Sequence, residues 1–319
     1  MFNTSMAKCS RCGRKLAKIK LGYLQEELCT DCFDRFFEKR VRRTIRVNGL
    51  LKTDDKVCVA VSGGKDSAVV ASIMKKLSKK APRSELFAMT VDEGIPSKKG
   101  AFKAAEALCS ELGIEQHVIT FKEELGSTME QIMRRVRELK SPAHGCTYCG
   151  VLRRQILNQK ARELGATKLA TGHNLDDEIQ VGMMNFIRGE LDRLARMGAI
   201  VGVIADKKFV PRIKPLRESP EDEVRFYAES NCIPFASTIC KYSEEAFRGT
   251  MRAAVDLIED RHTGSKYQIL RSIDSLVPIL RGDFEKRTKG KIGYCRECGE
   301  LASAEECNVC KIKKQVGLI

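Results

Sequence analysis

The sequence predicts an α/β protein: a parallel sheet covered by helices on both faces, with a small cysteine-rich ribbon at each end of the chain. Three observations support this fold class. Short β-branched runs alternate with helical segments, a glycine-rich turn follows the first run, and paired CxxC motifs stand near both termini. With 43% hydrophobic residues among 319, the chain can bury a sizeable core, which excludes a disordered or collagen-like protein.

The expected elements follow in chain order. Strands are expected at residues 56–61, 86–91, 116–121 and 168–171, and helices at 67–77, 97–112, 123–140 and 149–164, with another from about Leu175. After Pro220 the pattern turns mainly helical, with helices expected at 221–231, 243–259 and 267–281. Because ligands of parallel sheets bind at the carboxyl ends of the strands, the turn after the first strand points to a site.

Composition also bears on location and partners. No run approaches the roughly 20 apolar residues that cross a bilayer, and residues 1–8 lack the apolar core of a signal peptide, so we expect a soluble, cytoplasmic protein without a membrane partner. The 57 Lys and Arg residues against 42 Asp and Glu give a net charge of +15, which attracts polyanions. Nucleic acid is the first such partner, although charge alone does not separate it from an anionic surface or an acidic protein.

Eight of the 14 cysteines form two sets of paired CxxC motifs. Four soft thiolates close a tetrahedral structural zinc site, and cysteines in a reducing compartment suggest metal before disulfide. We therefore expect two zinc ribbons, with the ligands Cys9, Cys12, Cys29 and Cys32 in the first and Cys295, Cys298, Cys307 and Cys310 in the second. An iron–sulfur cluster at either set is the competing interpretation.

Of the remaining cysteines, Cys58, Cys109 and Cys232 are interpreted as small apolar core residues. Cys146 and Cys149 form a lone CxxC in a segment expected to be a loop between helices. From their spacing alone, this pair is a redox pair, half of a metal site or a chance pattern.

The glycine-rich turn has the features of a phosphate cradle. Glycines let backbone N–H groups approach a phosphate, the start of a helix adds positive potential, and a lysine neutralises further charge. It is not a Walker A loop, because Val59 and Asp66 stand where that motif needs glycine and Ser or Thr. The residues of the turn are Ser62, Gly63, Gly64, Lys65, Asp66 and Ser67.

SGGKDS after a hydrophobic strand resembles the PP-loop of the ATP pyrophosphatases, which cleave ATP between its α and β phosphates and transfer AMP to a substrate. TGHNLDD, at residues 171–177, resembles an element of the PP-loop enzymes that modify tRNA. The resemblance implies that Gly172 approaches the nucleotide and that Asp177 acts in the reaction centre on Mg²⁺ or on the substrate. From the residues alone, Asp176 and Asp177 are an acidic first helical turn that complements the helix dipole.

Further segments narrow the resemblance to the tRNA 2-thiolation proteins of the PP-loop superfamily. CTYCGVLRR at 146–154, NFIRG at 185–189, KPL at 214–216 and both ribbons carry it over nearly the whole chain. The first two look closer to the wobble-uridine thiolases than to the T-loop thiolases, which carry lysine where Arg153 stands. The family implies an enzyme, an ATP-dependent tRNA uridine 2-sulfurtransferase, which adenylates the C2 oxygen of uridine and replaces it with sulfur.

The same resemblance assigns the sulfur to a 4Fe-4S cluster held by Cys146, Cys149 and Cys240, with Cys232 as the fallback for the third ligand. Three thiolates on four irons leave one iron open to hold sulfide. The rival chemistry is a persulfide on one cysteine of this trio that another resolves. A non-catalytic zinc-ribbon protein that binds tRNA is the alternative outside the enzymes.

The resemblance also implies partners and a division of the chain. Besides ATP with Mg²⁺ and two Zn²⁺, we expect a tRNA substrate, sulfur from a ubiquitin-like thiocarboxylated carrier or from free sulfide, and a homodimer. Arginines such as Arg153 and Arg154 are expected to bind tRNA phosphates. The expected parts are a ribbon and basic helix at 1–45, a PP-loop catalytic domain at 46–220, a helical extension with the third cluster cysteine at 221–288, and a second ribbon at 289–319.

Overall fold

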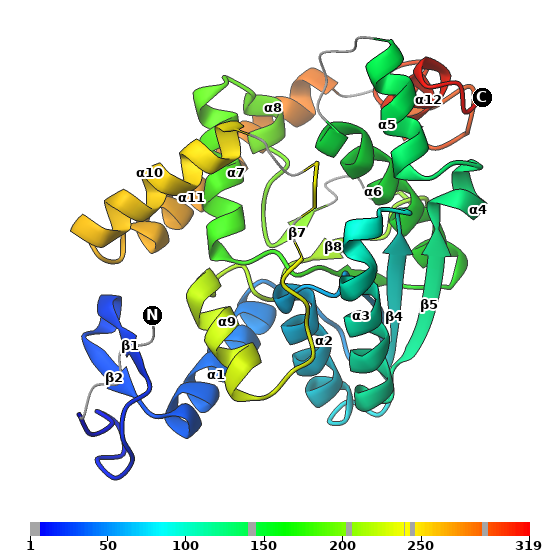
Figure 1. Ribbon diagram of the computed structural model, residues 1–319. Helices are drawn as coiled ribbons and strands as arrows, with labels where there is room; N and C mark the ends of the chain where they lie inside the picture. The colour runs from blue at the N-terminus through cyan, green and yellow to red at the C-terminus, as the bar shows by residue number, and fades with distance from the viewer. Residues whose placement is uncertain (1–6, 140–144, 202–205, 239, 243–245, 289–292) are drawn as a thin grey trace.

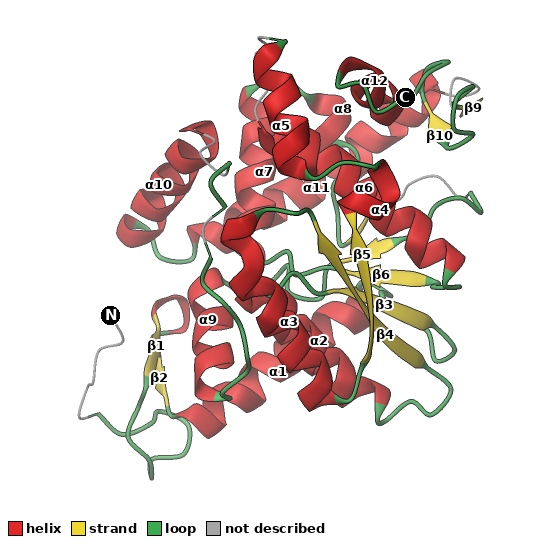
Figure 2. Cartoon of the chain, turned by 45° about the vertical axis from the view of Figure 1, so that its right-hand side comes forward, coloured by secondary structure: helices red, strands yellow, loops and turns green. Residues whose placement is uncertain are grey.

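The computed structural model describes residues 7–139, 145–201, 206–238, 240–242, 246–288 and 293–319. Within these residues the centre is a six-stranded sheet in the order β5-β4-β3-β6-β8-β7. Figure 2 labels β3, β4, β5 and β6 of this sheet. All neighbours pair in parallel except β7, which runs antiparallel at one edge. The predicted α/β class is confirmed. The strands are β3 (Lys56–Ala60), β4 (Glu85–Asp92), β5 (Glu115–Thr120), β6 (Lys168–Ala170), β7 (Ile200–Val201) and β8 (Arg212–Ile213).

Helices cover both faces of the sheet, and the side chains of β3 show how. Val57 and Val59 pack into one core and Cys58 into the other, because successive side chains of a strand point to opposite faces. The first core includes residues of α1 (Thr30–Val47), α2 (Lys65–Ser78), α3 (Lys99–Leu112) and α9 (Glu221–Ser230). The second includes residues of α4 (Phe121–Leu125), α5 (Met129–Glu138) and α6 (Gly145–Glu163).

The helix expected at 123–140 is two helices, α4 and α5. Gly126 ends α4 with a φ of 68°, a conformation that costs glycine little. Thr128 then caps α5 through a capping box with Gln131. The prediction of a single helix was therefore wrong. The apolar residues keep the spacing of a helix across this region, although Gly126 ends one helix and Thr128 starts the next.

Four helices pack together beyond one end of the sheet (Figure 1): α7 (Leu175–Ile187), α8 (Leu191–Leu194), α10 (Ala246–Arg261) and α11 (Ser265–Thr288). The expected start of a helix at 243 lies outside the described residues. None of the described helices combines the length and the apolar character needed to span a bilayer.

The two ribbons lie on opposite sides of the molecule (Figure 1). The N-terminal ribbon pairs β1 (Ile19–Leu21) with β2 (Glu26–Leu28) around a short turn, η1 (Gly22–Leu24). It is anchored on α9, where Tyr23 donates to Glu223 at 2.7 Å and Arg40 of α1 lies 2.8 Å from the same carboxylate. The C-terminal ribbon comprises β9 (Gly293–Tyr294), β10 (Leu301–Ala302) and α12 (Asn308–Gln315).

A buried ion-pair network joins α7 to α11 through the segment after β8. Glu178 lies 2.6 Å from the Nζ of Lys214, and Arg217 lies 2.6 Å from Asp274. Glu178→Ala leaves Lys214 buried without its carboxylate, which costs about 3–5 kcal/mol. For a chain of this size we expect the thermal midpoint, measured by circular dichroism, to fall by about 10 °C.

The control for this prediction is the exposed pair of Lys56 and Glu85. Glu85→Ala is expected to change the midpoint by no more than about 2 °C, because exposed ion pairs contribute little. Equal shifts in the two variants would show that the Glu178 network adds nothing beyond a surface pair.

Candidate functional site

A cavity of about 360 Å³ opens at the carboxyl ends of β3, β4 and β6. The two predicted motifs meet in it, although more than 100 residues separate them in the sequence. Gly63 and Lys65 belong to the same turn but are not among its lining residues. The predicted residues that line the cavity are Ser62, Gly64, Asp66, Ser67, Gly172 and Asp177.

The turn after β3 requires its first glycine. Gly63 has a φ of 78°, and a Cβ atom there would lie 1.8 Å from the backbone oxygen of Ala101 in α3. Gly172 is constrained similarly, because its Cβ would lie 2.7 Å from the backbone nitrogen of Ser67. The backbones of the two motifs are therefore in direct contact. Gly64, Asp66 and Ser67 line the cavity, so the start of α2 offers a site for an anion there.

The ammonium group of Lys65 pairs with two carboxylates. Its Nζ lies 2.9 Å from Asp66 and 2.9 Å from Glu221 of α9. Burial favours the neutral amine, but these carboxylates outweigh it and raise the pKa of Lys65. The sequence did not identify Glu221 as a site residue. The only feature that could have drawn attention to it is the acidic start of the helix after Pro220.

Asp176 and Asp177 are neighbours in the sequence with different surroundings. Asp176 is buried, pairs with Lys266 of α11 and accepts from the backbone N–H of Glu221 at 2.7 Å. Asp177 faces the cavity and pairs with Arg248 of α10. Burial raises the pKa of Asp177 to about 6, although Arg248 favours the charged form. Asp177 also completes a capping box with Asn174 at the start of α7. It therefore fits both expectations from the sequence: it is part of an acidic first helical turn, and its carboxylate faces the cavity.

His173 is a neutral residue of the cavity wall. Its Nδ1 lies 2.9 Å from the hydroxyl of Thr171. His173 is exposed to the cavity, where desolvation by the surrounding atoms and the nearby Lys214 and Arg212 lower its pKa to about 3. The ring therefore adds no charge to the site near neutral pH.

The central CxxC lies at the start of α6, so the prediction of a loop there was wrong. The Sγ of Cys146 lies 2.8 Å from the backbone oxygen of Tyr242. Cys149 and Cys240 pack against the same core, and burial raises the pKa of Cys149 to about 11. The segment 240–242 thus brings Cys240 to the CxxC. One helical turn after Cys149, Arg153 reaches the cavity wall and pairs with Glu93 at 3.1 Å.

The segment before Cys240 also contacts the glycine-rich turn. The backbone N–H of Ala236 donates to the oxygen of Gly63 at 2.9 Å. Cys232, at the start of this segment, is exposed and has a φ of 50°, so its assignment to the core was wrong. Cys58 and Cys109 are buried as expected.

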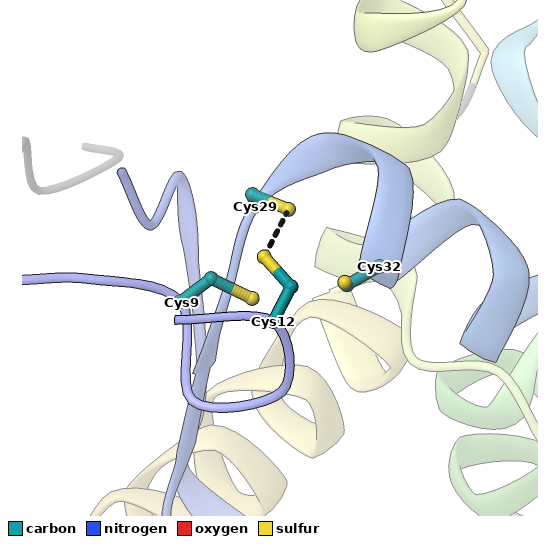
Figure 3. Close-up of side chains that lie close together, drawn as sticks. All are labelled: Cys9, Cys12, Cys29 and Cys32. Carbon is teal, nitrogen blue, oxygen red and sulfur yellow. Dashed lines mark hydrogen bonds between the residues drawn. The ribbon is translucent and has the colours of Figure 1, made fainter. Parts of the chain in front are cut away.

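Each terminal ribbon gathers its four thiols into a compact set. The ligand atoms of each set lie within 4.8 Å of one another. Figure 3 shows the first set, in which Cys12 and Cys29 are 3.8 Å apart. In the second, Cys298 and Cys307 are 3.7 Å apart. Four converging thiols with no competing carboxylate fit one tetrahedral soft metal ion.

The comparisons with known proteins agree with this geometry. The family model described as PP-loop domain matches residues 33–256. The tRNA 2-thiolation protein NcsA of Haloferax volcanii is 34% identical over 97% of this chain and 99% of its own length. The chain belongs to the tRNA 2-thiolation proteins. Cytoplasmic tRNA 2-thiolation protein 1 of Chlamydomonas reinhardtii is 33% identical over 95% of this chain and 83% of its own.

A solved member of the tRNA 2-thiolation proteins has the same fold. The U34-tRNA thiolase NcsA from Methanococcus maripaludis, solved with its 4Fe-4S cluster, matches with a TM-score of 0.82 and 36% identity. The match covers 97% of this chain and 96% of that one. The family resemblance inferred from SGGKDS, TGHNLDD and CTYCGVLRR is therefore confirmed.

The sequence of this tRNA 2-thiolation protein did not single out three charged residues of the cavity wall. They are Glu93, which binds Arg153 and Lys98, Arg212 at the start of β8, and Arg248, the partner of Asp177. Each comes from a different element, and none belongs to a recognisable short motif. Only the folded chain places them beside the nucleotide motifs.

Proposed function

We propose that this protein is an ATP-dependent tRNA uridine 2-sulfurtransferase that acts on the wobble uridine. The observation that carries the proposal is the set of contacts made by residues 232–238 and 240–242. This segment donates a hydrogen bond to Gly63 in the PP-loop and also holds Cys240 and Tyr242 against the CxxC of α6. The same short stretch of chain therefore contacts the turn that would bind ATP and supplies the third of the three thiols. The solved wobble-uridine thiolase and Arg153 in place of lysine support the wobble position over the T-loop.

The PP-loop supplies the activation step. The C2 oxygen of uridine is a poor leaving group, and its attack on the α-phosphate of ATP makes it part of AMP while pyrophosphate leaves. Backbone N–H groups at the start of α2 and the ammonium of Lys65 stabilise the charge that develops on the pyrophosphate. Lys65 must then exchange Asp66 or Glu221 for phosphate oxygens. Asp177 and Asp66, whose carboxylates border the cavity, would hold the Mg²⁺ that neutralises further phosphate charge.

The three thiols of Cys146, Cys149 and Cys240 would hold a 4Fe-4S cluster. Thiolates are the ligands such clusters take, and when bound, the cluster supplies an iron with an open position for sulfide. The chain's own contribution is to hold these partly buried thiols near one another, with Arg153 of the same helix on the cavity wall toward the adenylated substrate. The sulfur would come from a ubiquitin-like thiocarboxylated carrier or from free sulfide. We also propose a cytoplasmic homodimer, in line with the names of the eukaryotic relatives for the location.

The two ribbon sites would each hold one structural Zn²⁺ and no catalytic metal. Cys12→Ser is expected to lower the zinc content from about two to about one per chain, because three thiolates and a hydroxyl bind zinc far more weakly. Atomic absorption on the purified protein measures this. Cys232→Ser serves as the control and is expected to retain both ions. Retention of both ions by Cys12→Ser would remove it from the ligand set.

Anaerobic reconstitution tests the proposed function. The protein is incubated with ATP, sulfide and unmodified tRNA, and the nucleosides are analysed by mass. We expect 2-thiouridine at the wobble position together with AMP and pyrophosphate. Thiouridine in the T-loop would reassign the position, and thiouridine from iron-free protein would show that sulfide attacks the adenylated carbon and displaces AMP without a cluster. A protein that binds tRNA but never forms thiouridine would be a binding protein.

A further inference from the structure

Two arginines of the cavity wall have no carboxylate partner within the described part of the chain. Arg153 and Lys98 pair with Glu93, and Arg248 pairs with Asp177. By contrast, Arg154 of α6 and Arg212 of β8 form no ion pair or side-chain hydrogen bond with the residues that the structure describes. Among the described residues, the cavity therefore holds two guanidinium groups whose charge no carboxylate compensates.

These two guanidinium groups lie close enough to repel each other. Burial, followed by the charge of Arg154, lowers the pKa of Arg212 to about 10. Arg154 is exposed at the cavity wall, where partial desolvation and the nearby Arg153 and Arg193 lower its pKa, against the opposite effect of Cys149. The guanidinium of Arg154 rests over Gly150, where an added Cβ would lie 3.3 Å from Nη1. Placing unpaired cations together is costly unless an anion joins them.

The position of Arg212 argues against the phosphates of ATP as that anion. The PP-loop follows β3, whereas β8 lies two strands away in the sheet, beyond β6. At about 4.8 Å per strand, the backbone of Arg212 is roughly 10 Å to the side of the PP-loop strand. A second anion must enter with the other substrate. A uridine that reaches the α-phosphate brings its own phosphodiester into the mouth of the cavity.

We propose that Arg154 and Arg212 together bind the backbone phosphate next to the target uridine. This inference rests on the proposed function, because it takes tRNA as the second substrate. Two planar guanidinium groups suit the oxygens of a phosphodiester. Arg193, on α8 near Arg154 and largely exposed, marks the side from which the RNA backbone arrives.

The test compares Arg154→Gln, Arg212→Gln and the double variant with wild type. Arg83→Gln is the matched control, because it removes an exposed arginine in the turn before β4, at the opposite end of the sheet. Binding of unmodified tRNA is measured at several salt concentrations, and binding of ATP separately. We expect each single variant to bind tRNA about tenfold more weakly. We also expect the double variant to lower the slope of log affinity against log salt by about one.

ATP affinity and the thermal midpoint are expected to stay at the wild-type values, and Arg83→Gln to bind tRNA normally. Weakened ATP binding with unchanged tRNA binding would overturn the proposal and assign the pair to the nucleotide. An equal loss in Arg83→Gln would also overturn it, because the effect would then be general charge. Since these are binding measurements, they stay separate from thiolation. Wild-type protein that makes no thiouridine refutes the proposed function, whereas normal tRNA binding by both variants refutes only this inference.

Discussion

Cys240→Ala is expected to abolish thiouridine formation while leaving zinc content and the affinities for ATP and tRNA near the wild-type values. Cys240 reaches the CxxC through the segment that follows Ala236, and it packs into the core beside Cys149. In the proposed function, this substitution removes one of the three thiolates that would hold the cluster. Cys240 is only partly buried and belongs to neither ribbon, so the folded protein is expected to persist. The measurements are nucleoside mass analysis, iron and zinc content, and equilibrium binding.

Cys232→Ala is the matched control for this prediction. Cys232 lies eight residues earlier on the same segment, but its side chain is exposed. We expect this variant to retain iron and full thiolation. If Cys240→Ala keeps its activity and Cys232→Ala loses it, the third ligand is Cys232. If both keep their activity, neither cysteine serves in the sulfur site.

Asp177→Asn is expected to lower AMP formation by about 100-fold or more while the protein stays folded. The carboxylate faces the cavity between Arg248 and the start of α7, where a Mg²⁺ or the reacting uridine would meet it. Asparagine retains an oxygen that can accept from the backbone N–H of Asn174, so the helix cap survives. The measurement is tRNA-dependent release of AMP, together with the thermal midpoint.

Asp176→Asn separates this role from the general effect of an acidic helical turn. Asp176 is buried and pairs with Lys266, so its neutralisation is expected to lower the thermal midpoint by several degrees, and AMP formation by the folded protein is expected to persist. The two substitutions remove the same charge from adjacent positions of α7. Equal losses of AMP formation would mean that the negative charge of the turn, rather than the Asp177 carboxylate, is what matters.

The local motifs were predictable because each rests on contacts between near neighbours in the chain. The glycine of a tight turn, the cap of α7 and the CxxC pairs are specified within a few residues, so SGGKDS, TGHNLDD and the ribbon cysteines are visible in the sequence. The errors arose where neighbours give conflicting signals. The helical period hid the break at Gly126, and the glycines around the CxxC suggested a loop where α6 begins.

The sequence by itself determined the alternation of strands and helices, the phosphate-binding turn and two sets of four thiols, because short-range periodicity and spacing encode them. Only the tertiary structure decided that Glu221 holds Lys65, that Arg248 faces Asp177, and that Arg154 and Arg212 line the same cavity. These residues come from elements far apart in the chain. Their electrostatic interactions depend on distances that are set when the helices pack on the sheet, and no local pattern records those distances.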